Sequence, residues 1–207
     1  IDGLVTADGR PLAPVEAVSG TLAPAAADPD ARFAVRPYPA RLAAIVTAKD
    51  GVSYRLRPLR AEDEPGLAQF GQRMTPDDLR LRFFQPMRAL SHELAARLTQ
   101  IDYDREMAFG LFPADGDAML AVVRLHREPR GDSGEFAITV RSDMQGHGFG
   151  RLMMERILDY ARAQKIKTVF GLVLAENSGM LRLARSLGFS ARSEPGDATV
   201  VRVEIAL

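Results

Sequence analysis

Hydrophobic and polar residues alternate along several short stretches of this chain, and a period of two predicts half-buried β-strands. A different pattern occupies 168–174, where the residues form an almost continuous apolar run. Such a run is typical of a strand that is buried on both faces. The strands predicted in this way span 53–59, 108–112, 118–126, 134–140, 168–174 and 199–205.

Between these stretches, apolar residues recur at intervals of three and four, which predicts amphipathic helices. Thr75 before Pro76, and Ser91, are caps that mark where two of them begin, and Gly188 ends the last. The predicted helices are one beginning at 61 and others over 75–83, 91–99, 149–163 and 177–187. The order β-α-α-α-β-β-β-α-β-α-β indicates an α+β fold whose middle strands form a meander.

The first part of the chain differs from the rest in composition and in pattern. Residues 9–39 are dominated by Ala, Pro, Gly and Asp and show no sustained period of either kind. Composition of this sort is typical of a linker. We therefore predict a linker or tail over 1–42 and a single folded domain over 43–207.

Composition and charge restrict the function classes. Hydrophobic residues are 46% and charged residues 26%, as in ordinary globular domains. Lys+Arg and Asp+Glu are each 27, so no net field favours nucleic acid or an anionic membrane as a partner. The chain has no Cys, and its three His residues have no ligand spacing, so no metal site is predicted. Without a membrane-length apolar run or a signal-like start, we expect a soluble cytoplasmic protein.

A glycine-rich loop lies between the strand 134–140 and the helix 149–163. Its glycines, at 146, 148 and 150, expose backbone N–H groups at the positive end of a helix dipole, a geometry that binds diphosphate. A flexible turn is the alternative interpretation. A dinucleotide-binding fold is disfavoured because no acidic residue stands at 165–168, and the Gly-Lys-Ser/Thr of a Walker loop is absent.

Residues 140–150 resemble the acetyl-CoA signature of the GNAT superfamily of N-acetyltransferases, Gln/Arg-x-x-Gly-x-Gly/Ala, through Gln145, Gly148 and Gly150. Asn177 and Gly188-Phe189 match a second element of that family at its spacing. The resemblance covers 52–207. It implies a mostly antiparallel mixed sheet of about six to seven strands with about four to five helices, and acetyl-CoA as co-substrate. It also implies a pantetheine and diphosphate site formed by Ile138, Thr139, Val140, Gln145, Gly146, His147, Gly148, Phe149, Gly150, Arg151 and Asn177.

Within that family the chain is most similar to the acetyltransferase domain of bacterial Pat-type protein lysine acetyltransferases. The similarity rests on the segments 81–84 (Leu-Arg-Phe-Phe), 101–108 (Ile-Asp-Tyr-Asp-Arg-Glu-Met-Ala) and 135–137 (Glu-Phe-Ala). In those enzymes the domain is fused to an acyl-CoA-synthetase-like region, and 1–17 resembles the end of its ATP-grasp part. The resemblance implies a protein lysine as acceptor, with acetyl-CoA synthetase as the expected target.

The chemistry of amine acetylation favours a general base. Lysine has an ordinary pKa near 10.4, so presenting its neutral amine at pH 7 costs about 4.6 kcal/mol. Glu135, on the strand that leads to the glycine loop, is the predicted base, and the alternative is a solvated charge at a strand end. A splayed strand would leave the Val140 N–H free to stabilise the thioester oxyanion.

Many members of the family carry a Tyr seven residues after the Asn as general acid, and Ala184 stands there in this chain. Tyr160 and Ser186 are weaker substitutes, and both are also expected to serve packing. A thiol of pKa about 8.5 can leave as a thiolate and be protonated by water. The missing acid keeps open a non-catalytic acyl-CoA sensor as an alternative function, beside a small-molecule amine N-acetyltransferase.

Several charged and aromatic residues have both a functional and a structural interpretation. Arg82 and Phe83, with Asp77, are predicted to line the lysine channel, or else to end an amphipathic helix. Asp102 is a candidate substrate contact or part of a structural turn. Arg151 and Arg185 are candidate phosphate partners or solvated helix positions. His147 is expected to be an exposed loop residue rather than a base.

Overall fold

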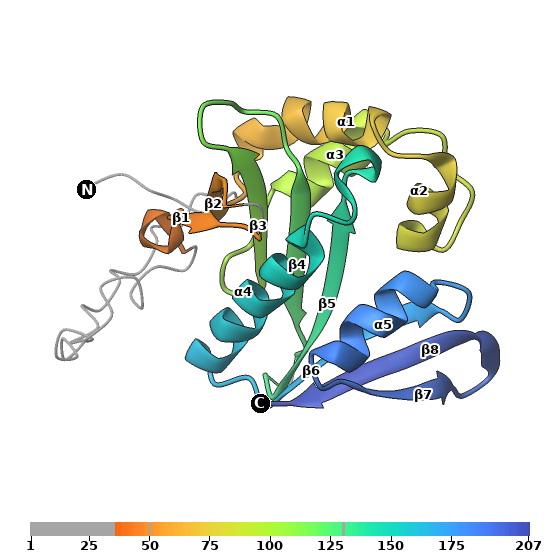
Figure 1. The fold of residues 1–207 in the computed structure, drawn as a ribbon. Helices are drawn as coiled ribbons and strands as arrows, with labels where there is room; N and C mark the ends of the chain where they lie inside the picture. The colour runs from red at the N-terminus through yellow and green to blue at the C-terminus, as the bar shows by residue number, and fades with distance from the viewer. Residues whose placement is uncertain (1–35, 50, 130) are drawn as a thin grey trace, which may run out of the picture. The chain divides into compact units, whose positions relative to one another are not determined.

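The computed structural model describes residues 36–49, 51–129 and 131–207, which lie in the compact unit Phe33–Leu207. These residues form five α-helices and eight β-strands (Figure 1). The strands are β1 (Ala44–Thr47), β2 (Ser53–Pro58), β3 (Glu106–Pro113), β4 (Ala121–Arg127), β5 (Ser133–Val140), β6 (Thr168–Leu174), β7 (Ser190–Glu194) and β8 (Asp197–Ala206). The helices are α1 (Glu64–Gln72), α2 (Pro76–Phe83), α3 (His92–Thr99), α4 (Phe149–Ala163) and α5 (Ser178–Ser186), with short 3₁₀ turns at Ala40–Leu42, Ala61–Asp63 and Ser142–Met144.

One mixed sheet organises the domain. The strand order is β1-β2-β3-β4-β5-β6-β8-β7, and every pair is antiparallel except β5 with β6. A parallel pair needs a crossover connection, which α4 provides. Helix α4 covers one face of the sheet, while α1, α2 and α3 lie on the other (Figure 1). The predicted mostly antiparallel α+β fold is confirmed.

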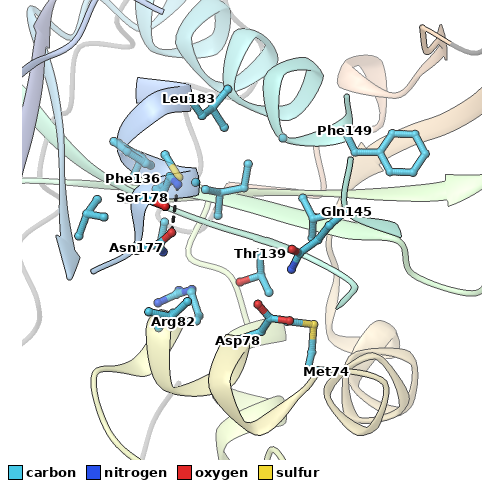
Figure 2. Close-up of a pocket in the computed structure, with 18 of the residues that line it drawn as sticks. Met74, Asp78, Arg82, Phe136, Thr139, Gln145, Phe149, Asn177, Ser178 and Leu183 are labelled. Carbon is cyan, nitrogen blue, oxygen red and sulfur yellow. Dashed lines mark hydrogen bonds between the residues drawn. The ribbon is translucent and has the colours of Figure 1, made fainter. Parts of the chain in front are cut away.

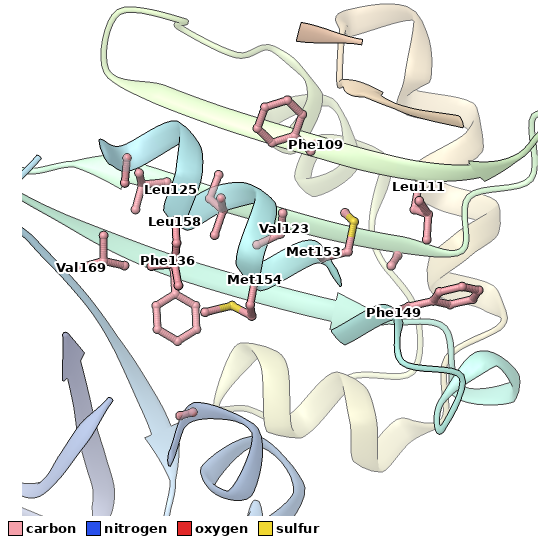
Figure 3. Packing of buried hydrophobic residues seen from close by; sticks show 14 of the residues in the cluster. Phe109, Leu111, Val123, Leu125, Phe136, Phe149, Met153, Met154, Leu158 and Val169 are labelled. Atoms are coloured by element: carbon pink, nitrogen blue, oxygen red, sulfur yellow. The ribbon is translucent and has the colours of Figure 1, made fainter. Parts of the chain in front are cut away.

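Alternating residues of the strands build a separate core on each face. On β3, Phe109 and Leu111 pack beneath α4, whereas Ala108 and Phe112 belong to the core beneath α1 and α2. Helix α4 supplies a fully buried stripe to the first core, consisting of Met153, Met154, Ile157, Leu158 and Ala161 (Figure 3). Burying each large apolar side chain contributes about 1.5–3 kcal/mol, so this stripe fixes α4 on the sheet.

Strands β5 and β6 are in register only over their first residues. Ser133, Gly134 and Glu135 lie opposite Thr168, Val169 and Phe170, and the pairing ends there. By contrast, β4 stays paired with β5 up to Val140, and β6 stays paired with β8 up to Leu174. The two central strands therefore diverge beyond Glu135 and open the sheet on the side of α2 and α5.

The sheet has eight strands rather than the six to seven that we predicted. Strand β1 is short and lies at one edge, and β7 has the sequence Ser-Ala-Arg-Ser-Glu, which carries no apolar alternation. Both edge strands are held through backbone pairing with β2 and β8, so the side-chain pattern does not reveal them.

The predicted linker over 1–42 lies mostly outside the described residues. Of the part that the structure describes, the Tyr38 hydroxyl donates to the Pro58 carbonyl over 3.1 Å, and the Leu42 carbonyl accepts from Arg156 over 2.8 Å. Within residues 36–49, 51–129 and 131–207, no helix combines the length and apolar character that a membrane span requires.

Candidate active site

A cavity of about 500 Å³ occupies the space where β5 and β6 diverge. Strand β5 lines one wall with Glu135 to Val140, and the glycine loop closes one end. Side chains of α2 and of the β6–α5 connection face each other across it: Arg82 and Asp78 on one side, Asn177 and Ser178 on the other (Figure 2). Segments that are far apart in sequence therefore share one site.

Two glycines of the loop adopt a backbone that other residues avoid. Gly146 has φ 83° and Gly148 has φ 85°, both in the left-handed region. Gly148 is also the N-cap of α4, where no side chain caps the helix and no acidic residue stands in the first turn. The first N–H groups of α4 therefore remain available to an anion at the positive end of the helix dipole.

Gly150 has a different role from its two neighbours. A Cβ at this position would lie 3.1 Å from the Leu183 Cδ2 atom, so its absence lets α4 approach α5 closely. Both helices contribute to the cavity, through Phe149 and Gly150 on α4 and Leu183 on α5. The spacing of the three glycines thus combines an anion-binding turn with a close helix contact.

Asp78 of α2 links that helix to the segment before the glycine loop. The Ser142 hydroxyl donates to its carboxylate over 2.5 Å and accepts from the Thr75 N–H over 2.9 Å. Burial raises the pKa of Asp78, but hydrogen bonds from Ser142, Thr75 and Gln145 outweigh it and lower the pKa below its ordinary value. Gln145, the first residue of the predicted signature, therefore lies against α2 as well as in the cavity wall.

Lys49 is a cation beside the glycine loop that the sequence did not identify. Its side chain lies against Gly148, with the Lys49 Cδ atom 3.3 Å from where a Cβ would stand. In the part of the chain that the structure describes, its ammonium makes no ion pair. It comes from the β1–β2 turn, a hundred positions earlier in the chain, so no local motif could have indicated it.

Arg151 and Arg185, the predicted phosphate partners, do not line the cavity. Arg151 donates to Ser186 Oγ over 2.7 Å and to Glu155 over 3.2 Å, which joins α4 to the end of α5. Arg185 is exposed, and neither arginine lines the cavity. His147 is exposed, folds back on the Met144 and Gln145 carbonyls, and stacks on Phe149 at 6.0 Å between ring centres.

Glu135 is a half-buried carboxylate in the cavity wall. It lies opposite His126 on β4 and Phe170 on β6, at the last position where β5 and β6 pair. Among the described residues it makes no hydrogen bond or ion pair, in contrast to the neighbouring Glu106, which pairs with Arg124. Its oxygens are therefore available to a ligand or to water.

The Val140 N–H lies on the open edge of β5. The Arg141 N–H donates to the Leu120 carbonyl on the β4 side over 2.9 Å, and the Asp132 carbonyl accepts from Thr168 on the β6 side. Because the backbone groups of successive strand residues point to opposite sides, the N–H of Val140 points toward β6. There β6 has already diverged, so this donor has no strand partner.

Arg82 is the cation that faces Glu135. Burial and the neighbouring Arg124 lower the pKa of Arg82 to about 10, against the opposing effect of Glu135 and Glu106. It makes no ion pair within the described ranges, and its guanidinium lies over the Phe83 ring at 4.9 Å. Arg124 is held by Glu106 and by the Leu98 carbonyl over 2.6 Å, whereas Arg82 and Glu135 both line the cavity and form no ion pair with each other.

Asn177 lines the cavity and begins α5. Its Oδ1 atom accepts from the Met180 N–H over 3.0 Å, so the residue caps the helix with its oxygen (Figure 2). Its amide nitrogen has no partner among the described residues, which leaves it free for a ligand.

This chain lacks the Tyr that many family members use as general acid, and neither of the predicted substitutes, Tyr160 and Ser186, lines the cavity. Ala184 is 0% exposed and belongs to the core beneath α4. Tyr160 packs against the same core, where burial raises its pKa, and Ser186 bonds to Arg151 and to the Leu183 carbonyl. Of the hydroxyl groups in the described part of the chain, Thr139 and Ser178 line the cavity.

Of the four predicted acceptor contacts, Arg82 lines this cavity. Phe83 packs against the core beneath α1, and Asp77 pairs with Arg80 over 2.8 Å at another depression. Asp102 accepts from the Asp104 N–H over 3.1 Å on the surface. No group of three or more His, Asp or Glu residues within the described ranges is arranged to hold a metal ion.

The diverging central strands and the glycine turn suit an acyl-CoA-dependent transferase, and the chain belongs to the acetyltransferase (GNAT) domain family, whose model matches residues 54–190. Acetyl transfer from acetyl-CoA is the chemistry of that family. Over 76% of this chain and 86% of the relative, the sequence is 32% identical to acetyltransferase PA5475 of Pseudomonas aeruginosa.

Solved structures agree with this assignment. The GNAT domain of S. lividans PAT superposes with a TM-score of 0.76 at 28% identity, covering 83% of this chain and 100% of that one. RimL, a ribosomal L7/L12 α-N-protein acetyltransferase in complex with coenzyme A, superposes with a TM-score of 0.62 at 16% identity over 79% of this chain and 98% of its own. At 16% identity, the similarity to RimL shows the fold alone.

Proposed function

We propose that this protein transfers acetyl from acetyl-CoA to the ε-amine of a lysine in another protein, by direct attack within one ternary complex. The observation that carries the proposal is Glu135, a half-buried carboxylate without a partner in the described part of the chain, which lines the cavity where β5 and β6 diverge. Cofactor and acceptor can meet there because the opening extends from the glycine loop to α2.

The residues fit acetyl-CoA without further assumptions. N–H groups at Gly148 and the first turn of α4 bind the diphosphate, and Lys49, whose stem packs against Gly148, can bring its ammonium to the same anion. The pantetheine arm contains two amide bonds, which add to the open edge of β5 as an extra strand would. Asn177 offers its free amide nitrogen to the same arm from the opposite wall.

The reaction then needs a proton acceptor and an oxyanion donor. Glu135 takes a proton from the incoming amine, directly or through one water, and the amine nitrogen attacks the thioester carbon. On the open edge of β5 the N–H of Ile138 points the same way as that of the predicted donor Val140 and is nearer to Glu135, so it donates to the carbonyl oxygen as negative charge builds on it. When the C–S bond breaks, the coenzyme A thiolate leaves, and the second proton that the nitrogen loses passes through water to the thiolate, so no side-chain acid is required.

The acceptor side supports a protein substrate. Phe84 is 43% exposed and Leu172 is 37% exposed, and both of these apolar residues line the cavity. They suit the long aliphatic stem of a lysine that enters from a protein surface. The likeness to S. lividans PAT at 28% identity and the Leu-Arg-Phe-Phe segment at 81–84 support acetyl-CoA synthetase as the target.

One observation favours a small amine as the alternative acceptor. Arg82 is a cation without an ion pair in the described residues, and it could hold the carboxylate of an amino-acid-like substrate. A third candidate, a non-catalytic acyl-CoA sensor, rests on the buried Ala184.

The acceptor class is tested by incubating the protein with labelled acetyl-CoA and either purified acetyl-CoA synthetase or a set of polyamines and amino acids. We expect label on a lysine of the protein acceptor and no turnover of free amines above the rate without enzyme. Label confined to small amines would contradict the acceptor proposal, and binding of acetyl-CoA without any transfer would indicate the sensor.

A further inference from the structure

The aromatic ring of Phe136 lies at the point where β5 and β6 separate. The last paired residues are Glu135 and Phe170, so the next two along the strands are Phe136 and Gly171. A Cβ at Gly171 would stand 2.6 Å from the Phe136 Cε1 atom and 2.7 Å from its Cζ atom. The ring therefore fills the space over Gly171 and needs a glycine there.

Core packing holds the ring in this place. Phe136 is 4% exposed and meets the Phe189 ring edge to face, with 5.4 Å between centres and an interplanar angle of 67°. Figure 3 shows it beneath α4, beside Met154. Although it belongs to the core, Phe136 also lines the cavity, at the point where β5 and β6 separate. A ring packed on this many sides does not turn away freely to make room.

The cofactor geometry directs the acyl group to the point where β5 and β6 separate. The diphosphate site at Gly148 follows β5 after the 3₁₀ turn Ser142–Met144, and the open edge of β5 runs back from Val140 to Phe136. The four residue steps from Val140 to Phe136 span about 13 Å of extended strand, along which the pantetheine arm can run. The thioester then lies near Glu135, and its acyl chain points toward the place where the strands meet.

We propose that Phe136, seated on Gly171, sets the acyl chain length and restricts this enzyme to acetyl and the next shortest acyl groups. This inference rests on the proposed acyl transfer and adds the donor class to it. The apolar side chains of Ile138, Val173 and Met180, which also line the cavity, offer no polar partner for a substituted acyl group. The donor class is accordingly a short, unsubstituted acyl-CoA.

The test uses the full chain and four thioesters: acetyl-, propionyl-, butyryl- and hexanoyl-CoA. For each, kcat/KM is measured by release of free coenzyme A, and the dissociation constant by calorimetry without acceptor. In the parent, we expect kcat/KM to fall steeply, and the dissociation constant to rise steeply, for acyl groups longer than propionyl. In Phe136→Ala and Phe136→Leu, the butyryl-to-acetyl ratio of kcat/KM should rise roughly 10- to 100-fold, the range that misfitting methylenes give in a closed apolar pocket.

Phe109→Leu is the matched control. Phe109 is fully buried in the same core and meets Tyr160 edge to face at 6.0 Å, but it does not line the cavity. This substitution should lower the unfolding temperature much as Phe136→Leu does and leave the chain-length ratio unchanged.

Gly171→Ala tests the same contact from the other side and keeps Phe136. The added methyl group forces the ring to move, so we expect propionyl-CoA to lose affinity more than acetyl-CoA, and Phe136→Leu in the same chain to restore it. Gly171→Ala therefore tests whether Phe136 sets the acyl chain length even if Phe136→Ala does not fold.

Two kinds of failure are distinguishable. If the parent binds the thioesters but transfers none, the proposed function is wrong, while the binding series still measures chain length. If the Phe136 variants transfer acetyl but their ratios match those of Phe109→Leu, Phe136 does not set the chain length. A parent that accepts hexanoyl-CoA as well as acetyl-CoA would also overturn the inference.

Discussion

Gly148 shows at the scale of one residue how the backbone prepares a ligand site. Its φ of 85° costs other residues about 1–2 kcal/mol, and Lys49 packs against the position where a Cβ would be. We expect Gly148→Ala to weaken acetyl-CoA binding roughly 5- to 30-fold, because the loop must distort. Gly196→Ala is the control: Gly196 has φ 88° but nothing within 4 Å of its Cβ position, and it does not line the cavity.

Equal loss of unfolding temperature in both glycine variants, with loss of acetyl-CoA affinity in Gly148→Ala alone, would support the assignment of the loop. Equal affinities measured by calorimetry would contradict it.

Lys49 adds a charge that can move toward the diphosphate. Removing it in Lys49→Ala should raise the KM for acetyl-CoA about threefold to tenfold, and the effect should fade at high salt because exposed charges are screened. Lys167→Ala is the comparison, since Lys167 pairs with Asp132 over 3.0 Å and lies outside the cavity. A KM that is unchanged in Lys49→Ala at low salt would remove Lys49 from the cofactor site.

At the scale of elements, Asp78 joins α2 to the segment that carries Gln145. Because its pKa is lowered in the folded protein, its carboxylate stabilises the fold above the ordinary value of 3.8, and that stabilisation is lost as the pH falls from 3.8 through the lower folded pKa. Asp78→Asn should therefore destabilise the protein on the order of 1 kcal/mol at pH 7, after allowing for solvent exposure.

The difference in unfolding temperature between the parent and Asp78→Asn should shrink as the pH falls below 3.8. Asp115→Asn, an exposed position outside the cavity, should show no such difference at either pH. Thermal unfolding followed by circular dichroism at pH 7 and pH 3 makes the comparison. If the difference in unfolding temperature between the parent and Asp78→Asn is the same at both pH values, Asp78 does not stabilise the fold through its charge.

The pattern of the sequence predicted elements best where side chains determine them. The apolar run gave β6 with its observed bounds, Thr168–Leu174, and the capping residues Thr75 and Ser91 begin α2 and α3 as predicted. Strand β7 was missed because backbone pairing with β8 holds five residues of which none is buried. Side-chain periodicity carries no information about such an edge.

At the scale of the whole molecule, the site depends on tertiary contacts that a linear pattern does not contain. The glycine loop and Glu135 could be named because they lie next to each other in one strand–loop–helix unit. Lys49 could not be named, and neither could the contact of Asp78 with Ser142, since both residues reach the loop from distant elements. The divergence of β5 from β6 follows from the register of the two strands, which the sequence does not specify.

Binding of acetyl-CoA should stabilise the whole domain, because in the proposed complex the cofactor contacts β5, α4 and α5. At a concentration 100 times the dissociation constant the gain is about 2.7 kcal/mol. For a domain of this size we expect the unfolding temperature to rise by roughly 5–10 °C. Differential scanning calorimetry measures this rise in unfolding temperature with acetyl-CoA and, for comparison, with free adenosine. Equal shifts for the two ligands would show that the diphosphate and pantetheine contacts contribute nothing.

The central claim is that Glu135 is the base for acetyl transfer to a lysine, and single-turnover transfer by Glu135→Gln tests it most directly. With labelled acetyl-CoA and acetyl-CoA synthetase as acceptor, the parent should label a lysine at pH 7, and Glu135→Gln should be slower by about 10²- to 10⁴-fold. The ratio of the parent rate to the Glu135→Gln rate should decrease as the pH approaches about 10.4, the ordinary pKa of lysine, because the amine then needs no base. Glu93→Gln, at an exposed position on α3, should match the parent. A rate for Glu135→Gln equal to that of the parent at pH 7 would contradict the account.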